Sequence, residues 1–198
     1  MLSKIRFNAL DIETTSLDKN AEILSIAIVP MLGTRILIRD CYSTFIKSKR
    51  INAKSIKIHG IDIKTIESAP RFEEVSEIIF KKLENGIVVG CDIEFDVSIL
   101  KKYFSNQDLK FDPRRIDILQ IERYIRRKTA GRNINTFDEL IRIYRLDDFY
   151  RHSALVDAYY SAQIFQLQLK RLMLHGISLE ELLRIGKRRE DFIPFYIG

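Results

Sequence analysis

The order of apolar and polar positions predicts three strands at the start of the chain. Residues 4–12 alternate and carry many apolar side chains, and residues 22–31 are strongly β-branched. Residues 32–34, Leu-Gly-Thr, are typical of a tight turn that leads into a third strand over residues 35–47. Because the connections are short, we expect the three strands to form an antiparallel meander.

After residue 70 the pattern changes to helices that alternate with strands. Apolar residues recur at helical spacing from Phe72 to Leu83 and predict a helix. Residues 86–90, Gly-Ile-Val-Val-Gly, are apolar throughout, which is typical of a strand buried on both faces of a parallel sheet. The pattern also predicts a short strand at 112–117 and helices at 95–104, 118–127, 136–144, 154–174 and 178–186.

This order of elements predicts an α/β fold with a mixed β-sheet, three antiparallel strands plus parallel strands, flanked by helices. The length of 198 residues favours one domain, which we place at residues 1–174. Residues 175–198 are then expected to form a C-terminal helical extension and tail. The apolar end of the tail, residues 192–197, is expected to pack on its own domain or on a second copy, and the second case would give a homodimer.

Composition narrows the class of protein. The chain is 46% hydrophobic and 30% charged, which favours a soluble protein with a sizeable core. Its longest apolar runs are far shorter than a membrane span, so no membrane partner is expected. Cys41 and Cys91 lie far apart without metal-binding spacing, which is typical of reduced thiols in a cytoplasmic protein. The net charge of +6 favours an anionic partner such as nucleic acid.

Two acidic residues end the first predicted strand. Side chains two positions apart on a strand point to the same face, so Asp11 and Glu13 are expected to project together. Two carboxylates on one face repel each other unless a cation lies between them. The alternative is that both are solvated acids at the end of a strand.

A second acidic group lies where the buried strand at 86–90 leads into a helix, the position at which open α/β sheets bind ligands. Asp96 is expected in the first turn of that helix. Asp92 and Glu94 are competing candidates for the same site. Their alternative interpretation is that of acids favoured by the positive end of the helix dipole.

The third group is RHSALVDA, residues 151–158. On one continuous helix, His152 and Asp157 would point about 140° apart, so they would not share a face. Ser153 is a good N-cap, and it predicts that the helix begins between them. His152 would then lie just outside the helix and Asp157 inside its first turns, where a single site could use both.

Taken together, these residues resemble the DnaQ-like, or DEDDh, family of 3′–5′ exonucleases, which have the RNase H-like fold. The family motif Asp-x-Glu-Thr-Thr is matched at residues 11–15, and Phe-Asp-x-x-x-Leu at residues 95–100. The motif His-x-Ala-x-x-Asp-Ala is matched at residues 152–158. Each motif alone is a weak signal, but three in the family's order are specific, and the resemblance extends over roughly residues 5–173.

The resemblance implies a catalytic centre made of Asp11, Glu13, Asp96, Asp157 and His152. The four acids would hold two Mg²⁺ ions, with Mn²⁺ able to substitute, because these ions prefer hard oxygen ligands. Two ions ~3.5–4 Å apart can stabilise both the attacking and the leaving oxygen of an in-line displacement. His152 would take a proton from the attacking water, since an imidazole has an unperturbed pKa of ~6.5.

The resemblance also implies contacts with the 3′-terminal nucleotide. Thr14 and Thr15 would contribute backbone and hydroxyl contacts and Leu17 an apolar contact, although turn chemistry and ordinary packing explain these residues nearly as well. Phe95 could stack on a base, but a core aromatic at a helix start is the safer interpretation. His59 is expected to be structural, with Gly60 and Ile61 shaping a turn beside the site.

Two features bear on how the substrate is held. Many family members carry His-Asn where this chain has Cys91-Asp92, a departure that adds negative charge near the metals and puts nucleotide contacts in question. Basic residues cluster at 123–132, ahead of the His152 loop. Within this cluster we expect Arg126 and Arg127 to hold phosphates of the strand that enters the site.

The predicted function is therefore a metal-dependent 3′–5′ exonuclease that releases nucleoside 5′-monophosphates from a single-stranded 3′ end, with DNA favoured. It would act in repair, in trimming, or in proofreading beside a DNA polymerase. The first alternative is an exoribonuclease that trims RNA. The second is a non-catalytic nucleic-acid-binding or assembly module, which is disfavoured because such a module gains nothing from a repulsive cluster of carboxylates.

Overall fold

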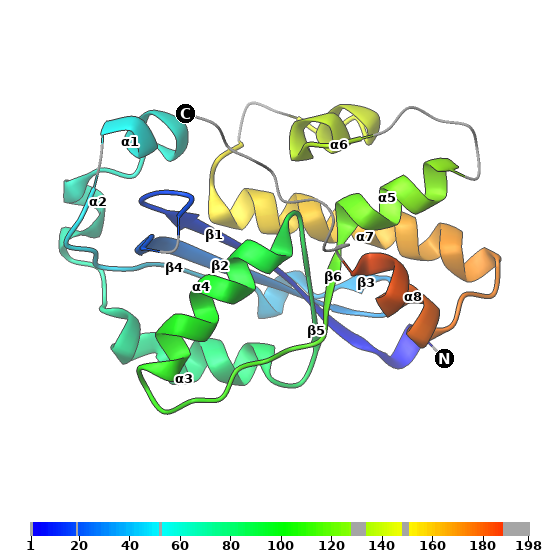
Figure 1. Ribbon diagram of the computed structural model, residues 1–198, viewed down its shortest axis with the longest axis horizontal. Coiled ribbons are helices and arrows are strands. Elements are labelled where there is room, and N and C mark those ends of the chain that lie inside the picture. The colour runs from blue at the N-terminus through cyan, green and yellow to red at the C-terminus, as the bar shows by residue number, and fades with distance from the viewer. Residues whose placement is uncertain (1, 19, 52, 128–133, 148–150, 188–198) are drawn as a thin grey trace.

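The computed structural model describes residues 2–18, 20–51, 53–127, 134–147 and 151–187, and these residues fold around one mixed β-sheet (Figure 1). Its strands are β1 (Arg6–Thr14), β2 (Ile23–Leu32), β3 (Arg35–Ile36), β4 (Tyr42–Phe45), β5 (Ile87–Gly90) and β6 (Arg115–Asp117). The strand order is β3-β2-β1-β5-β6, with β4 also paired to β2. β1 runs antiparallel to β2 and parallel to β5, and β5 runs parallel to β6. The predicted mixed sheet is confirmed.

Helices precede, connect and cover the strands. The short 3₁₀ helices are η1 (Leu2–Lys4) and η2 (Ile38–Asp40). The α-helices are α1 (Ala53–His59), α2 (Ile63–Glu67), α3 (Phe72–Leu83), α4 (Ile93–Ser105), α5 (Ile118–Arg127), α6 (Phe137–Ile143), α7 (Ala154–Leu174) and α8 (Leu179–Gly186). The helices from α3 onward lie within two residues of their predicted bounds. The sequence pattern did not predict α1 and α2, which are short and bury one residue each.

The predicted third strand over residues 35–47 is wrong in one respect, because it is interrupted. β3 pairs with residues 31–32 of β2 and β4 with residues 25–28, and η2 fills the gap between them. The interruption lies opposite Pro30. The Leu37 N–H donates to the Pro30 carbonyl at 2.8 Å, but proline has no N–H with which to return the second bond of the ladder.

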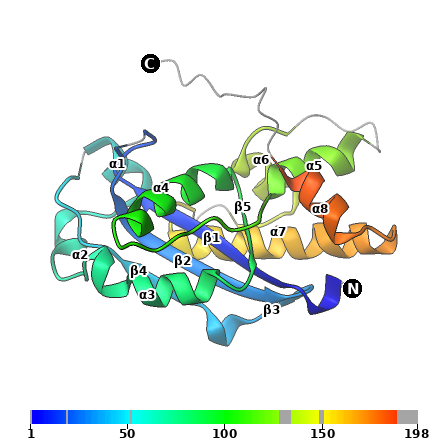
Figure 2. The same cartoon turned by 60° about the horizontal axis from the view of Figure 1, so that its bottom comes forward.

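The sheet separates two hydrophobic clusters, and α7 lies along one face while α3 and α4 lie on the other (Figure 2). Phe7 and Ala9 of β1 belong to the cluster on the α7 face, where the Phe7 ring packs edge-on against Phe165 of α7 at 4.9 Å. Leu10 and Ile12 belong to the cluster on the α3–α4 face. Because side chains alternate along a strand, the positions after Ala9 that share its face lie on the α7 side.

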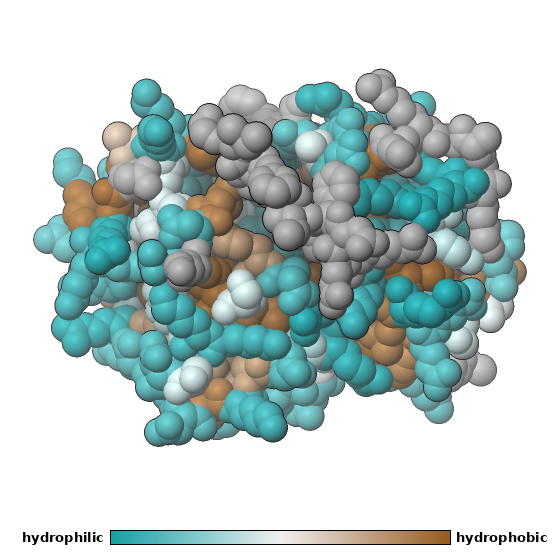
Figure 3. Space-filling view, in the orientation of Figure 1, coloured by the Kyte–Doolittle hydropathy of each residue, from teal (hydrophilic) through white to brown (hydrophobic). Residues whose placement is uncertain are grey.

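The face seen in Figure 3 is mostly hydrophilic, with separate hydrophobic areas between the charged side chains. Within the part of the chain that the structure describes, no helix is both long and apolar enough to cross a membrane.

The last described helix packs on the rest of the molecule. α8 contacts α5 and β6, its Leu182 is fully buried, and Gly186 lies so close to Ile116 that a methyl group there would clash. The boundary that we place after residue 174 stays a prediction. The predicted packing of residues 192–197 lies outside the described residues.

Candidate active site

Two acids reach the site from the end of β1. Asp11 and Glu13 share the face of Phe7 and Ala9, so they project toward the side of the sheet that α7 covers. β5 pairs with β1 only as far as Ala9, and this leaves the end of β1 open on that edge. A register shift against β2 follows directly after Glu13, as is common beside functional sites.

A third acid comes from the start of α7. Ser153 is the N-cap residue, as predicted, with extended backbone, although its hydroxyl makes no capping hydrogen bond. Asp157 lies in the first turns of the helix and is buried. His152 precedes the helix with a positive φ of 66°, and its backbone N–H donates to Asp157 Oδ2 at 3.2 Å.

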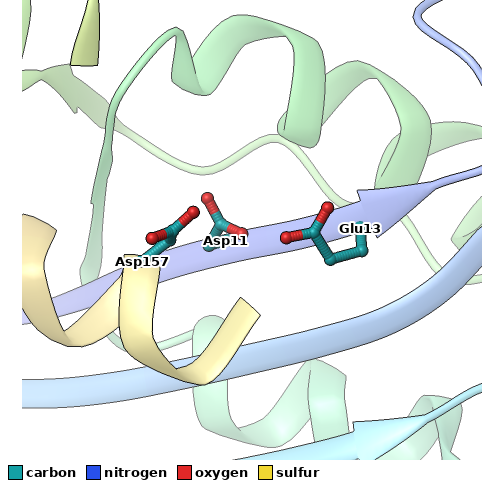
Figure 4. A group of neighbouring side chains, drawn as sticks. All are labelled: Asp11, Glu13 and Asp157. Atoms are coloured by element: carbon teal, nitrogen blue, oxygen red, sulfur yellow. The ribbon is translucent and has the colours of Figure 1, made fainter. Parts of the chain in front are cut away.

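These three acids meet. One carboxylate oxygen from each of Asp11, Glu13 and Asp157 lies within 4.8 Å of the other two, which is close enough for one metal ion. Figure 4 shows the two strand side chains and the helix side chain directed into the same space.

The fourth predicted acid lies beside them. Asp96 is in the first turn of α4 and only 7% of its surface is exposed. It accepts a hydrogen bond from the backbone N–H of Ile12, which lies between the two acids of β1. Its charge raises the pKa of Asp11. The structure therefore brings all four predicted acids to one place, three of them within shared reach of an ion.

The carboxylates of this cluster lie close enough together to raise the pKa values of one another. Burial and then the charges of Asp96, Asp157 and Glu13 hold the pKa of Asp11 well above its usual range. Burial first, and then Glu13, raises the pKa of Asp96 in the same way. Such a set of oxygen ligands fits a hard divalent cation, because a cation removes the repulsion that raises these pKa values.

Glu13 makes the stability of the metal-free protein depend on pH. Burial and the charge of Asp157 raise the pKa of Glu13 from 4.5 to about 7. The folded protein therefore binds a proton more tightly than the unfolded chain. The stability that this proton contributes is fully present below pH 4.5 and is lost as the pH rises through about 7.

We expect the metal-free protein in EDTA to lose on the order of 2 kcal/mol of unfolding free energy between pH 5 and pH 8, relative to Glu13→Gln. Glutamine mimics the protonated acid and cannot titrate, so it isolates this contribution from the rest of the protein. Denaturant unfolding of both proteins at the two pH values measures it. Parallel pH profiles for the two proteins would contradict the expectation.

Glu94 and Asp92, the two acids that compete with Asp96 for the site, are both exposed, whereas Asp96 is buried. Glu94 accepts two hydrogen bonds from Arg115, at 2.6 and 2.8 Å, which directs it away from the cluster. Asp92 is exposed and adopts a left-handed backbone with φ 48°, and its charge contributes to the raised pKa of Asp96. The negative charge of Asp92, which the sequence places near the site, therefore acts on Asp96, one of the four acids.

His152 is exposed at the edge of the site. His59 lies near enough for the charge of His152 to contribute to its lowered pKa, behind the larger effect of burial. His59 Nδ1 accepts the backbone N–H of Ile61 at 3.0 Å, and Gly60 between them has a φ of 69°. This geometry is that of a tight turn, in line with a structural part for His59.

Three of the predicted nucleotide contacts, Thr14, Thr15 and Leu17, end or follow β1, and the fourth, Phe95, is in α4. The Thr14 hydroxyl donates to the Ser16 carbonyl at 2.7 Å, and the Thr15 hydroxyl accepts the Glu22 N–H at 3.0 Å, so both shape the loop itself. Leu17 is 69% exposed and presents an apolar side chain to solvent. Phe95 packs partly buried against the cluster on the α3–α4 face. Contact with a nucleotide stays a prediction for all four.

The two predicted phosphate contacts differ in their surroundings. Arg126 bonds to the buried carboxylate of Glu122 at 2.9 Å, and Tyr144 donates to the same carboxylate at 2.6 Å. Arg126 thus has a structural partner, whereas Arg127 is exposed. Phosphate binding stays a prediction for both, and residues 128–132 of this basic group lie outside the described residues.

Sequence reasoning missed Arg151. Its guanidinium bonds to Asp157 Oδ1 at 3.2 Å and to Asp138 Oδ1 at 3.1 Å. It also lies over the ring of Phe137, 4.2 Å from the centroid. The signal in the sequence was its place directly before His152, but its partners on α6 could not be identified from spacing.

Comparison with known proteins gives a family match over most of the chain. A model of the exonuclease family RNase_T matches residues 9–165, a range that holds the four acids and His152. The DNA polymerase III PolC-type of Caldanaerobacter subterraneus subsp. tengcongensis is 29% identical over 93% of this chain. The match covers only 13% of that polymerase, so this chain spans a small part of its length.

Two further comparisons involve proteins of more similar size. The DNA polymerase III subunit epsilon of Buchnera aphidicola subsp. Acyrthosiphon pisum is 26% identical over 84% of this chain and 73% of its own length. The structure of exonuclease X in complex with 5′ overhanging duplex DNA is 20% identical, with a TM-score of 0.68 over 92% of this chain and 99% of that chain. This likeness in structure confirms the predicted fold.

Proposed function

Because this chain belongs to the RNase_T exonuclease family, we propose that it is a metal-dependent 3′–5′ exonuclease that releases nucleoside 5′-monophosphates. The observation that carries the proposal is the meeting of Asp11, Glu13 and Asp157 within reach of one ion, with Asp96 beside them. In a protein that only bound nucleic acid, this cluster would weaken the binding, because its carboxylates repel the phosphates, which carry the same negative charge.

The four acids would hold two divalent ions, Mg²⁺ or Mn²⁺, because both ions prefer oxygen ligands. When bound, such ions supply Lewis acidity and charge stabilisation for in-line phosphoryl displacement. Water attacks phosphorus, the bond from phosphorus to the 3′ oxygen breaks, and that oxygen stays on the shortened strand and takes a proton from solvent water to become its 3′ hydroxyl. His152 is exposed beside the acids, and we assign it the proton that the attacking water loses.

DNA is the substrate that the comparisons support, and we propose a single-stranded 3′ end as the part of it that enters the site. The names of the relatives include DNA polymerase III PolC-type and subunit epsilon, and the similar exonuclease X was solved with DNA. Leu17 and Arg127 are exposed and are the residues that we assign to the terminal nucleotide and to a phosphate. The two polymerase relatives also support association with a DNA polymerase as the setting.

We infer a cytoplasmic location from the thiols. Cys41 and Cys91 are both free and partly buried, as is typical of proteins in reducing compartments.

The test uses single-stranded DNA and RNA oligonucleotides of one sequence, each labelled in separate samples at the 3′ or the 5′ end. We expect Mg²⁺ or Mn²⁺ to give a descending ladder from 5′-labelled DNA and free mononucleotide from 3′-labelled DNA. Removal of the metal with EDTA should abolish both products, because the acids then have no ion to hold.

Each of the other outcomes has a defined meaning. Faster shortening of RNA would replace DNA with RNA as the substrate and leave the chemistry unchanged. Mononucleotide released first from the 5′ end would contradict the polarity. Binding without shortening in either metal would contradict the enzyme and favour the binding module.

A further inference from the structure

Arg151 occupies an unusual position for an arginine, because its guanidinium lies among the acids of the candidate metal centre. Its side chain is only 10% exposed, and it bonds directly to Asp157, one of the acids that meet in the cluster. Its positive charge lowers the pKa of Asp11 and of Glu13, so it lies close to these two as well. In the metal-free protein, Arg151 therefore balances part of the charge that a metal ion would balance.

A second set of contacts holds the same guanidinium from α6. Asp138 forms an ion pair with it, with 3.1 Å between the nitrogen and Oδ1, and the Phe137 ring lies under the guanidinium, 4.2 Å from ring centroid to Cζ. Both contacts come from residues that are not among the predicted metal ligands, although the charge of Asp138 also contributes to the raised pKa of Asp157. The Nε of Arg151 is buried and has no hydrogen-bond partner among the described residues, so the guanidinium is not held by a full set of bonds.

These two sets of contacts differ in what a metal ion does to them. A divalent ion that binds Asp157 withdraws negative charge from Arg151 and repels it, because both are cations close together in a partly buried site. The contacts with Asp138 and Phe137 are unaffected and can keep the guanidinium at α6. When a metal ion binds Asp157, the contacts of Arg151 with Asp138 and Phe137 can therefore still hold its guanidinium.

We propose that Arg151 is an internal counter-cation for the metal centre, which gives up Asp157 when a divalent ion binds and is retained by Asp138 and Phe137. This inference rests on the proposed function, since it takes the acids to be metal ligands. It makes Arg151 a positioning residue, because His152 is its neighbour in the chain and donates its backbone N–H to the same Asp157. Binding of metal would then be coupled to the placement of the catalytic histidine.

The test is direct titration of the purified protein with Mn²⁺, followed by calorimetry or by the Mn²⁺ electron paramagnetic resonance signal, without substrate. Arg151→Met keeps an unbranched side chain and removes the charge, and we expect it to bind Mn²⁺ about tenfold more tightly because a competing cation is gone. In EDTA the same variant should melt at a lower temperature than the wild type, since its acids have lost their counter-charge. Saturating Mn²⁺ should narrow that difference.

Three further variants give matched controls. Phe137→Leu removes the ring under the guanidinium without any change of charge and leaves Arg151 more fully on Asp157, so Mn²⁺ should bind more weakly than in the wild type. Arg151→Lys keeps the charge but loses the fork that reaches both carboxylates and the stacking on Phe137, so its Mn²⁺ affinity should lie between those of the wild type and Arg151→Met. Arg39→Met makes the same change of charge at an exposed position in η2, between the edge strands β3 and β4, and should have no effect on Mn²⁺ affinity.

The outcomes separate this inference from the proposed function. Wild-type protein that does not bind Mn²⁺ would overturn both. Wild-type protein that binds Mn²⁺, with Arg151→Met equal to it or weaker, would overturn the counter-cation and leave the exonuclease standing. If Arg151→Met does not fold, the sign of the Phe137→Leu effect decides, and equal or tighter Mn²⁺ binding in that variant contradicts the proposal.

Discussion

Replacement of Asp11 with asparagine is expected to lower the rate of mononucleotide release by about three orders of magnitude, because a bound metal contributes several kcal/mol to stabilising the transition state. Asp11 is the acid whose pKa responds to all three of the others, since the charges of Asp96, Asp157 and Glu13 each raise it. Asparagine keeps the shape of the side chain but loses the charge that holds an ion. The measurement is the single-turnover rate with saturating Mg²⁺ and 5′-labelled DNA.

The same variant should be more stable than the wild type when no metal is present. Loss of one carboxylate relieves the repulsion in the cluster, so the melting temperature in EDTA should rise while activity falls. This opposite pair of effects distinguishes a lost metal ligand from a damaged fold, which would lower both. Such a trade-off, in which a residue that activity requires lowers the stability of the fold, is common in active sites.

Glu94→Gln is the matched control for Asp11→Asn. It removes one negative charge near the start of α4, but Glu94 is bound by Arg115 and does not face the cluster. We expect its activity to stay within a few-fold of the wild type. Equal loss of activity in the two variants would mean that general charge near the site, and not ligation by Asp11, explains the effect.

The parts of the fold that the sequence predicted are those governed by local periodicity. Alternation along β1 put Asp11 and Glu13 on one face, and the structure shows that this is the face that α7 covers. The N-cap at Ser153 separated His152 from Asp157, and α7 begins at the next residue. In both cases a few neighbouring residues contain all the information that the prediction needed.

The missed features depend on residues that are distant in the sequence. The third strand breaks because Pro30, on the neighbouring strand, cannot return a hydrogen bond. Glu94 is excluded from the cluster by Arg115, which follows it by 21 residues. Single-sequence patterns give the type and spacing of side chains, but not which distant side chain becomes their partner.

Arg151 shows the same limit inside the site itself. Repulsion between neighbouring carboxylates predicts a cation between them, and the family resemblance implies that metal ions fill this place. The structure places a guanidinium on one of those acids through a loop that also contacts α6. The charges in the sequence are compatible with an arginine near the cluster, but the contacts with Asp157 and Asp138 are what identify it as Arg151.

His152→Gln is expected to reduce kcat by about a hundredfold to ten-thousandfold, the usual contribution of a positioned general base. Glutamine can still form hydrogen bonds but cannot take the proton that the attacking water loses. KM and the affinity for Mn²⁺ should change little, because the contact of His152 with Asp157 is made by its backbone N–H, which the substitution keeps. Steady-state kinetics and the Mn²⁺ titration together measure this split.

A companion variant tests whether the imidazole itself is what the reaction needs. His152→Ala leaves space at an exposed position, so imidazole added to the solution should restore part of the lost rate, while it should leave Asp11→Asn inactive. The difference follows from the two parts assigned here: a free base can replace a base, but it cannot replace an oxygen ligand held at the end of β1. A His152→Gln protein with unchanged kcat would remove His152 from the chemistry and leave the acids to be paired with another base.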